Sequence, residues 1–195
     1  VLGKLSPDRI PLLRGLEQEN VDDDSMKAVC AAFGSTSGAP MLHIAGHTPE
    51  AGMPSAPAAD RVTIDREMLA DAWRQLNSGG ADIDLVAIGS PHLSLAELYL
   101  IDAAFDGRHR YADVKLIITI GRNMLDIARR DGVAARLEAS GAALYSDLCW
   151  CSITQPLFPP ETKVLMTNSG KYAHYATGLS GCRVRLGGIL SLIHI

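Results

Sequence analysis

Apolar and polar positions divide the chain into short apolar runs and longer stretches with helical spacing. The apolar runs at 39–46, 83–89, 114–121, 142–147 and 162–168 predict strands. The amphipathic stretches at 25–35, 65–76, 94–105, 122–132, 133–141 and 171–178 predict helices. Strands that alternate with helices favour right-handed βαβ units. We therefore expect an α/β fold with a mainly parallel sheet of about five strands and helices on both faces.

Two of the predicted helices carry start signals. Ser94 and Glu97 have the S-x-x-E spacing of a capping box, which predicts that a helix begins at Ser94. Asp22–Asp24 place acidic residues before the helix of 25–35, where they favour its N-terminus.

The unusual polar residues fall in the loops that follow the predicted strands. These loops are 43–47, 89–94, 121–123, 147–154 and 168–175. Parallel sheets bind ligands beyond the carboxyl ends of their strands. The sequence therefore predicts a functional site at that end of the sheet.

Composition narrows the functional classes. With 47% hydrophobic and 21% charged residues, the chain resembles one globular domain or a piece of a larger one. The formal net charge is −4 and charges of one sign form no long run, so we expect no nucleic-acid partner. No apolar run approaches the roughly 18 residues of a membrane span, and residues 1–10 lack a charged leader before an apolar stretch. We expect no membrane partner and a cytoplasmic protein.

The four cysteines do not suggest a disulfide framework in a chain of this length. We expect Cys30 and Cys182 to be small buried hydrophobic residues. In an extended segment the side chains of Cys149 and Cys151 would share one face, with Trp150 opposite. Both thiols could then face one cavity, and an inert role for this pair stays open.

The segment around Ser169 combines a helix start with reactive side chains. Gly170 and Lys171 at a predicted helix N-terminus could bind a carboxylate or phosphate, although the surrounding residues do not fit a Walker A loop. Ser169 lacks the G-x-S-x-G elbow of an acyl-transfer nucleophile, so proton transfer beside Lys171 is the better interpretation. His92 and His47 lie in strand-end loops without a spaced zinc pattern. An ordinary capped helix with solvated polar groups remains the alternative.

Four segments together resemble a known family. "SGAPMLHIAGHTPEA", "GSPHLSLAELYLIDAAF", "SDLCWCSI" and "TNSGKYAHYATGLSG" are similar to aconitase X, a divergent branch of the aconitase superfamily. The resemblance is collinear from about residue 22 to residue 189. It implies an aconitase-like catalytic domain fragment and an iron–sulfur hydro-lyase acting on a small hydroxy acid.

The resemblance implies one of two substrates. One branch of the family dehydrates cis-3-hydroxy-L-proline to a pyrroline-2-carboxylate, and the other dehydrates mevalonate 5-phosphate. The second branch tends to have Cys-Pro-His-Cys where this chain has Ser90–Leu93, and to lack a second cysteine after its D-x-C motif. Here Asp147, Cys149 and Cys151 form D-L-C-W-C. Both departures favour the hydroxyproline branch.

The resemblance also assigns roles to individual residues. Cys149 matches a cluster ligand, and Cys151 is the weaker candidate for a second. The catalytic group would be Ser169, Lys171 and His92, with Ser169 as base or proton shuttle. The residues expected to contact the substrate are Thr48, Asn168, Gly170 and His174.

The resemblance sets expectations about what the chain lacks. Residues 1–189 would form part of the catalytic domain, without the swivelling domain that family members carry fused or as a small subunit. Residues 190–195, "LSLIHI", coincide with the translation of a transposon mosaic-end adapter, so we hypothesise that they are non-native. A family cysteine is expected soon after "GGILS", where this sequence has "LIHI" instead. We therefore expect little or no activity from this polypeptide alone; an inactive scaffold and thiol redox chemistry at Cys149 and Cys151 are the alternatives.

Overall fold

The computed structural model describes residues 1–53 and 59–193 and divides the chain into two compact units. The first unit is Val1–Trp73 and the second is Arg74–Ile195. Among the described helices, none is long and apolar enough to cross a membrane.

The first unit is built from short elements around a small core. Its helices are α1 (Leu2–Leu5), α2 (Asp23–Gly34) and a 3₁₀ turn, η1 (Pro49–Gly52), and α3 (Arg66–Leu76) runs past its end. Strands β1 (Leu12–Leu13) and β2 (His43–Ile44) pair in parallel. The buried core consists of Phe33, Ala39, Leu42 and Ile44.

Two expectations for this unit need comment. Asp22 accepts a hydrogen bond from the backbone N–H of Ser25 and so begins α2, as the acidic segment predicted. The predicted strand at 39–46 is wrong in extent: only His43–Ile44 are paired, and they pair with β1 rather than joining the large sheet. An apolar run can form a small core without continuous strand pairing, and this one does.

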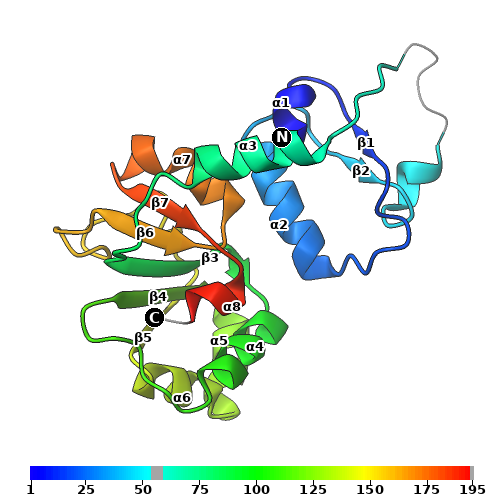
Figure 1. Ribbon diagram of the computed structural model, residues 1–195. Coiled ribbons are helices and arrows are strands. Elements are labelled where there is room, and N and C mark those ends of the chain that lie inside the picture. The colour runs from blue at the N-terminus through cyan, green and yellow to red at the C-terminus, as the bar shows by residue number, and fades with distance from the viewer. Residues whose placement is uncertain (54–58, 194–195) are drawn as a thin grey trace. The chain divides into compact units, whose positions relative to one another are not determined.

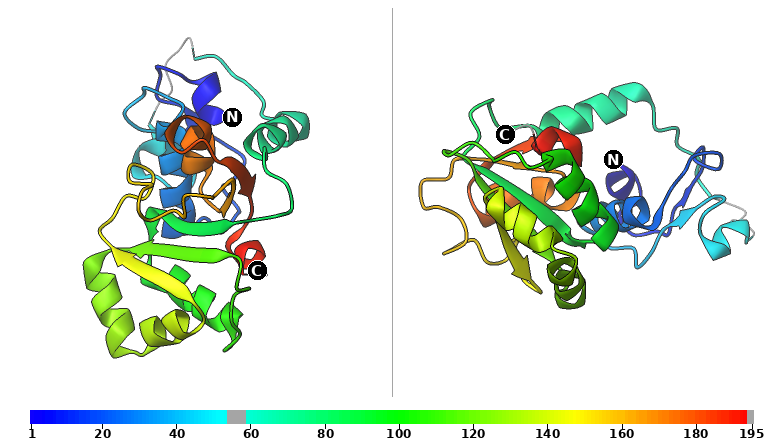
Figure 2. Two further views of the ribbon diagram at one scale, coloured as in Figure 1. Left: turned by 90° about the vertical axis from the view of Figure 1, so that its left-hand side faces the viewer. Right: turned by 90° about the horizontal axis from the view of Figure 1, so that it is seen from below.

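The second unit contains a five-stranded parallel sheet with the order β5-β4-β3-β6-β7. Figure 1 and the two further views in Figure 2 show these strands side by side. Their bounds are β3 Leu85–Leu93, β4 Lys115–Ile120, β5 Ala142–Ser146, β6 Val164–Thr167 and β7 Arg183–Leu186. The predicted α/β class and strand number are confirmed, with β7 in place of the run at 39–46.

Helices cover both faces of the sheet. One face packs against α4 (Leu95–Phe105), α5 (Arg122–Arg130), α6 (Val133–Ala139) and α8 (Ile189–Leu192), which enclose the larger core. The other face packs against α7 (Gly170–Leu179) and the loop before β6. Ser94 caps α4 in a complete capping box with Glu97, as its spacing predicted. Leu192 is buried in the larger core, whereas residues 194–195 of the hypothesised non-native tail lie outside the described residues.

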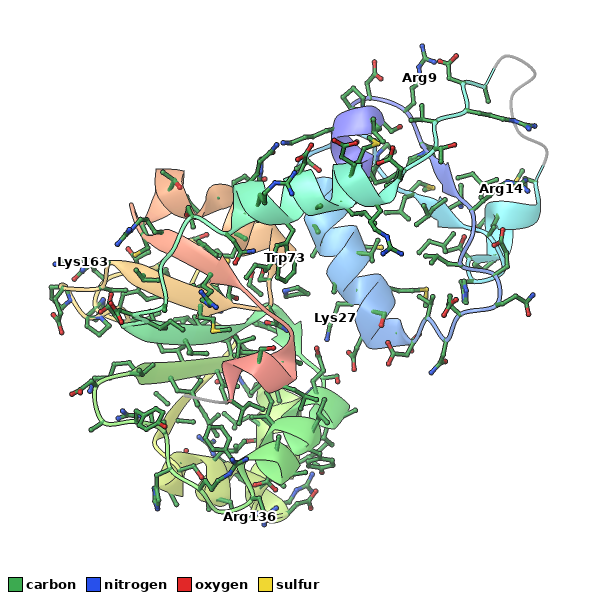
Figure 3. The ribbon with its side chains drawn as sticks, viewed as in Figure 1. Arg9, Arg14, Lys27, Trp73, Arg136 and Lys163 are labelled. Carbon is green, nitrogen blue, oxygen red and sulfur yellow. The ribbon has the colours of Figure 1, made fainter. Side chains whose placement is uncertain are left out.

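Polar contacts close the amino end of the sheet. Asp84 accepts two backbone N–H groups, from Lys163 and Val164, each at 2.8 Å, and so joins the starts of β3 and β6. Figure 3 labels Lys163 at this end of β6. On α6, Arg136 binds the Asp102 carboxylate of α4 through two nitrogens. The candidate chemistry lies in the loops at the opposite, carboxyl end of the sheet.

Candidate active site

Strand β3 ends in an irregular segment that shapes the site. Its pairing with β4 shifts register between Ile88 and Leu93. Gly89 adopts φ +107°, and a Cβ there would collide with the Thr119 carbonyl oxygen, so only glycine fits. The Thr119 hydroxyl donates to the Gly89 carbonyl at 2.8 Å. This bulge holds the following Ser90, which precedes a cis peptide bond, at the edge of the core.

The loop after β5 is a turn and not an extended segment. The backbone N–H groups of Ser152 and Ile153 both donate to the Cys149 carbonyl, at 3.0 and 3.1 Å. As a result Trp150 and Cys151 are buried while Cys149 is exposed. The segment is therefore not extended, and Trp150 packs in the same buried cluster as Cys151, so the expected position of Trp150 opposite both thiols is wrong.

The two thiols nevertheless interact, and their pKa values are shifted in opposite directions. Burial alone would raise the pKa of Cys149, but hydrogen bonds from the Ser152 hydroxyl and backbone, helped by the nearby Lys171 ammonium, lower it. Burial raises the pKa of Cys151, and the Cys149 thiol raises it further, while the Ser90 hydroxyl opposes the rise. The Lys171 ammonium acts to lower the pKa of both thiols, in agreement with the packing of the loop after β5 against the start of α7 through Trp150 and Tyr172.

Ser169 begins α7. Its hydroxyl accepts a hydrogen bond from the Tyr172 backbone N–H at 3.0 Å, and its side chain is buried. The next residues, Gly170 and Lys171, form the first turn of the helix, where backbone N–H groups favour an anion. The hydroxyl therefore has a structural role in addition to any chemical one.

Aromatic packing holds the loop after β5, residues 147–154 (hereafter the cysteine loop), against α7. The rings of Trp150 and Tyr172 have centroids 4.4 Å apart, and Phe158 completes the cluster. Burial raises the pKa of Tyr172 to about 12, although its hydroxyl contacts the Ser180 hydroxyl at 2.8 Å. These buried rings hold the segment that carries the thiols against α7.

His92 contacts the same loop. Its Nε2 is 3.0 Å from the Leu148 carbonyl oxygen. Beside it, the Arg122 backbone N–H and guanidinium bind Asp147 and lower the pKa of that carboxyl, with a smaller contribution from His92. Asp147 itself has φ +54°, which turns the chain at the end of β5.

The other predicted substrate contacts are more dispersed. Asn168 is half-buried between β6 and α7, and His174 is exposed on α7 with its ring against Tyr175. Thr48 belongs to the first unit, where its hydroxyl accepts from the Ile44 backbone N–H at 2.9 Å. The substrate roles of Thr48, Asn168, Gly170 and His174 stay predictions.

Further side chains refine the interpretation of the sequence. His47, in the first unit, contacts the Leu16 carbonyl oxygen through Nε2 at 2.7 Å, so its ring has a structural partner. Cys182 is buried as expected, but Cys30 is exposed on α2, contrary to expectation. Sequence reasoning gave no role to Ser90, whose hydroxyl lies 2.7 Å from the Cys151 sulfur.

Thiols, a cation and a helix N-terminus at one sheet end could bind a small acid and an electrophilic metal centre. Two thiols are suitable donors for iron. Among residues 1–53 and 59–193, however, no group of three His, Cys, Asp or Glu side chains is arranged to hold a metal ion. The donor type fits an iron–sulfur group, and a full ligand set would need residues beyond those described.

Comparison with known protein families gives two matches. Residues 1–74 match the aconitase X second domain, and residues 83–195 match the aconitase X third domain. The boundary between the matches lies close to the boundary between the two compact units.

Individual relatives agree with the family matches. The chain is 44% identical to a cis-3-hydroxy-L-proline dehydratase of Pseudomonas aeruginosa, over 98% of this chain and 34% of the relative. It is 35% identical to the enzyme of that name from Hypocrea jecorina, over 96% and 33%. A phosphomevalonate dehydratase large subunit of Methanocaldococcus jannaschii is 27% identical, over 99% and 47%. The crystal structure of Thermococcus kodakaraensis aconitase X, holo-form, superposes with a TM-score of 0.86 at 26% identity, covering 98% of this chain and 48% of that one. The chain thus spans about a third of the length of its hydroxyproline dehydratase relatives.

Proposed function

The chain belongs to the aconitase X family, and on that basis we propose that it forms part of a hydro-lyase that removes water from cis-3-hydroxy-L-proline. Relatives named for this reaction share 44% and 35% identity with nearly the whole chain. The relative named for phosphomevalonate shares 27%. The branch-specific sequence features at Ser90 and Cys151 favour the same choice.

The observation that carries the proposal is the position of Lys171. Lys171 occupies the first turn of α7, which packs against the loop of the two thiols through the Trp150 and Tyr172 rings, and its ammonium acts to lower the pKa of both thiols. A substrate carboxylate bound by Lys171 and the helix N-terminus would therefore lie beside sulfur. That arrangement suits an acid whose hydroxyl must leave close to its carboxylate.

The proposed reaction breaks two bonds on adjacent carbons. Loss of the proton α to the carboxylate forms a C=C bond while the hydroxyl leaves with a proton as water, and tautomerisation gives the pyrroline-2-carboxylate. Ser169 would take the α proton while the Lys171 ammonium holds the carboxylate and stabilises the charge that develops beside it, and His92 would provide a proton for the departing hydroxyl. Asn168, Gly170, His174 and Thr48 would contact the substrate. The Tyr172 backbone N–H already donates to the Ser169 hydroxyl oxygen, and this donor together with the Lys171 ammonium would favour the deprotonated form that accepts the α proton.

We propose an iron–sulfur cluster as the cofactor, with Cys149 as a ligand and Cys151 as a second. When bound, such a cluster supplies a Lewis acid for the leaving hydroxyl. The remaining ligands would come from outside the described residues. A swivelling domain or small subunit would complete the enzyme, consistent with a relative named as a large subunit.

One assay tests the reaction and its alternatives. The intact protein, reconstituted anaerobically with iron and sulfide, is incubated with cis-3-hydroxy-L-proline or mevalonate 5-phosphate, and product is measured by mass loss. We expect water loss from the proline only, and from neither compound with Cys149→Ser. Turnover of mevalonate 5-phosphate alone would overturn the substrate. A colourless protein with no turnover of either compound would favour the scaffold, and rapid disulfide exchange at Cys149 without turnover would favour redox chemistry.

A further inference from the structure

A buried contact joins two parts of the site that are 61 residues apart in sequence. The Ser90 hydroxyl oxygen lies 2.7 Å from the Cys151 sulfur. Ser90 is 7% exposed and Cys151 is 4% exposed. A polar contact excluded from water to this degree contributes more than the same pair would at the surface. The contact also links the end of β3 directly to the cysteine loop.

Strand geometry alone would not bring these side chains together. Successive residues of a strand point to opposite faces. Ala87 packs in the core that contains Cys151, and Ile88 packs in the core on the other face. Regular alternation would place Ser90 on the Ile88 face, away from the thiol. Ser90 instead meets Cys151, because the bulge at Gly89 redirects the chain.

Two contacts hold this redirected segment in place. Gly89 has φ +107°, and no larger residue fits against Thr119. The Thr119 hydroxyl donates to the Gly89 carbonyl, so β4 holds the backbone that carries Ser90. The hydroxyl is thus presented by a rigid strand end and not by a mobile loop. A side chain that is held in a fixed position in this way can orient a neighbouring side chain that binds a metal.

We propose that Ser90 is a positioning residue: its hydroxyl contacts the Cys151 sulfur, orients it for the iron–sulfur cluster and donates a hydrogen bond to the thiolate in the cluster-bound state. This inference rests on the proposed function. A donor to a ligand sulfur withdraws electron density from it, which raises the reduction potential of the bound cluster. It also orients the sulfur before metal arrives, which favours affinity.

The geometry can be tested without cluster or activity. In the metal-free intact protein carrying Cys149→Ser, the further substitution Ser90→Cys places a second thiol against Cys151. Oxidised glutathione should then convert the two thiols to a disulfide, releasing two molecules of glutathione, and mass spectrometry should detect the joined peptides. Ser140→Cys, at an equally buried serine at the amino end of the sheet, is the matched control and should not join to Cys151. Failure of Ser90→Cys to crosslink under these conditions would overturn the contact.

The tuning role needs a second measurement. The reconstituted intact protein is compared with Ser90→Ala, Ser90→Thr and Ser140→Ala by redox titration of the visible absorption and by iron-binding affinity. Ser90→Ala should shift the midpoint potential to a more negative value and weaken iron binding about 10-fold. Ser90→Thr, which keeps the hydroxyl, should restore both, and Ser140→Ala should change neither. An unchanged potential and affinity in Ser90→Ala would overturn the role of Ser90.

These outcomes separate the two proposals. If the wild type binds a cluster and eliminates water, but Ser90→Ala matches it in potential and affinity, only the positioning role is lost. If the wild type binds no cluster, the proposed function fails and the role of Ser90 fails with it, even where the Ser90→Cys variant forms its crosslink to Cys151.

Discussion

Removal of the Ser169 hydroxyl separates its structural role from its proposed chemical role. The hydroxyl caps α7 by accepting from the Tyr172 backbone N–H at 3.0 Å. Ser169→Ala should therefore cost about 1 kcal/mol of unfolding free energy. For a protein stable by at least about 5 kcal/mol, this leaves roughly one molecule in a thousand unfolded. The small unfolded fraction of Ser169→Ala therefore cannot by itself cause a measurable loss of activity.

Loss of a proton shuttle has a much larger expected effect. General acid or base groups contribute about 100-fold or more to the rate. Ser169→Ala should thus lower kcat by at least about 100-fold. Ser169→Gly should do the same while costing only a few tenths of a kcal/mol, because glycine is tolerated at an N-cap.

The matched control is the other serine cap of the same unit. Ser94→Ala removes a capping box and should also cost about 1 kcal/mol, but should leave kcat unchanged. Stability is measured from urea midpoints and kcat from pyrroline formation by the intact, reconstituted protein. Wild-type kcat in Ser169→Gly would refute the shuttle role, whereas loss of activity in both cap variants would trace the effect to helix stability.

The remaining predictions concern a strained glycine, a helix cap and a buried tyrosine. Gly89→Ala should lower the free energy of unfolding by about 3 kcal/mol, because at φ +107° its Cβ would collide with Thr119 of β4. Its control, Gly178→Ala, meets open space in α7 and should raise the free energy of unfolding by up to about 1 kcal/mol. Equal urea unfolding midpoints for the two variants would contradict this prediction. The Ser25 hydroxyl and backbone N–H lower the pKa of Asp22, so its carboxylate stabilises α2 above pH about 4, and this stabilisation is lost as the pH falls through the lowered pKa. The difference in unfolding free energy between wild type and Asp22→Asn should therefore shrink in acid. A difference that does not change with pH would contradict this role of Asp22. Burial raises the pKa of Tyr172 to about 12, so the free energy of unfolding should fall as the pH rises from about 10 to about 12. Urea titrations over this range should find a smaller loss of stability in Tyr172→Phe than in wild type. An identical loss in both proteins would exclude Tyr172 as its source.

Signals confined to neighbouring residues predicted structure well. The capping box at Ser94 and Glu97 depends on one helical turn, and it forms as its spacing indicates. The acidic cap at Asp22 is similar. The apolar runs that became β3 to β6 are long enough to cross a buried sheet, which is why the fold class could be predicted.

Signals that depend on distant partners were less informative. The run at 39–46 pairs only with β1, whereas the short, alternating β7 joins the large sheet. The local sequence of neither segment shows which strand it will pair with. The backbone N–H groups of Leu186 and Val184 in β7 donate to the side chains of Asn77 and Ser78, across more than 100 residues. Strand membership at a sheet edge therefore depended on tertiary contacts.

The candidate site was predictable as a location but not as a geometry. Loops after parallel strands are expected at one end, and the electrostatic coupling of Lys171 to both thiols agrees with that. The contact between Ser90 and Cys151 could not be predicted, because period-two alternation puts Ser90 on the wrong face. Gly89 was the available signal, since a glycine inside a strand pattern often marks a bulge.

The position of the thiols is a consequence of core packing. Trp150 lies between the two cysteines in sequence and is completely buried, and its ring centroid lies 4.4 Å from that of Tyr172. Burying so large a side chain contributes several kcal/mol to folding, far more than any one polar contact in the loop. Each cysteine is therefore adjacent in sequence to the buried Trp150. The Trp150 ring packs on Tyr172 of α7, the helix that also carries Lys171. A substitution that loosens Trp150 should consequently displace both thiols from the cation together, so the chemistry of this site cannot be altered independently of the core beneath it.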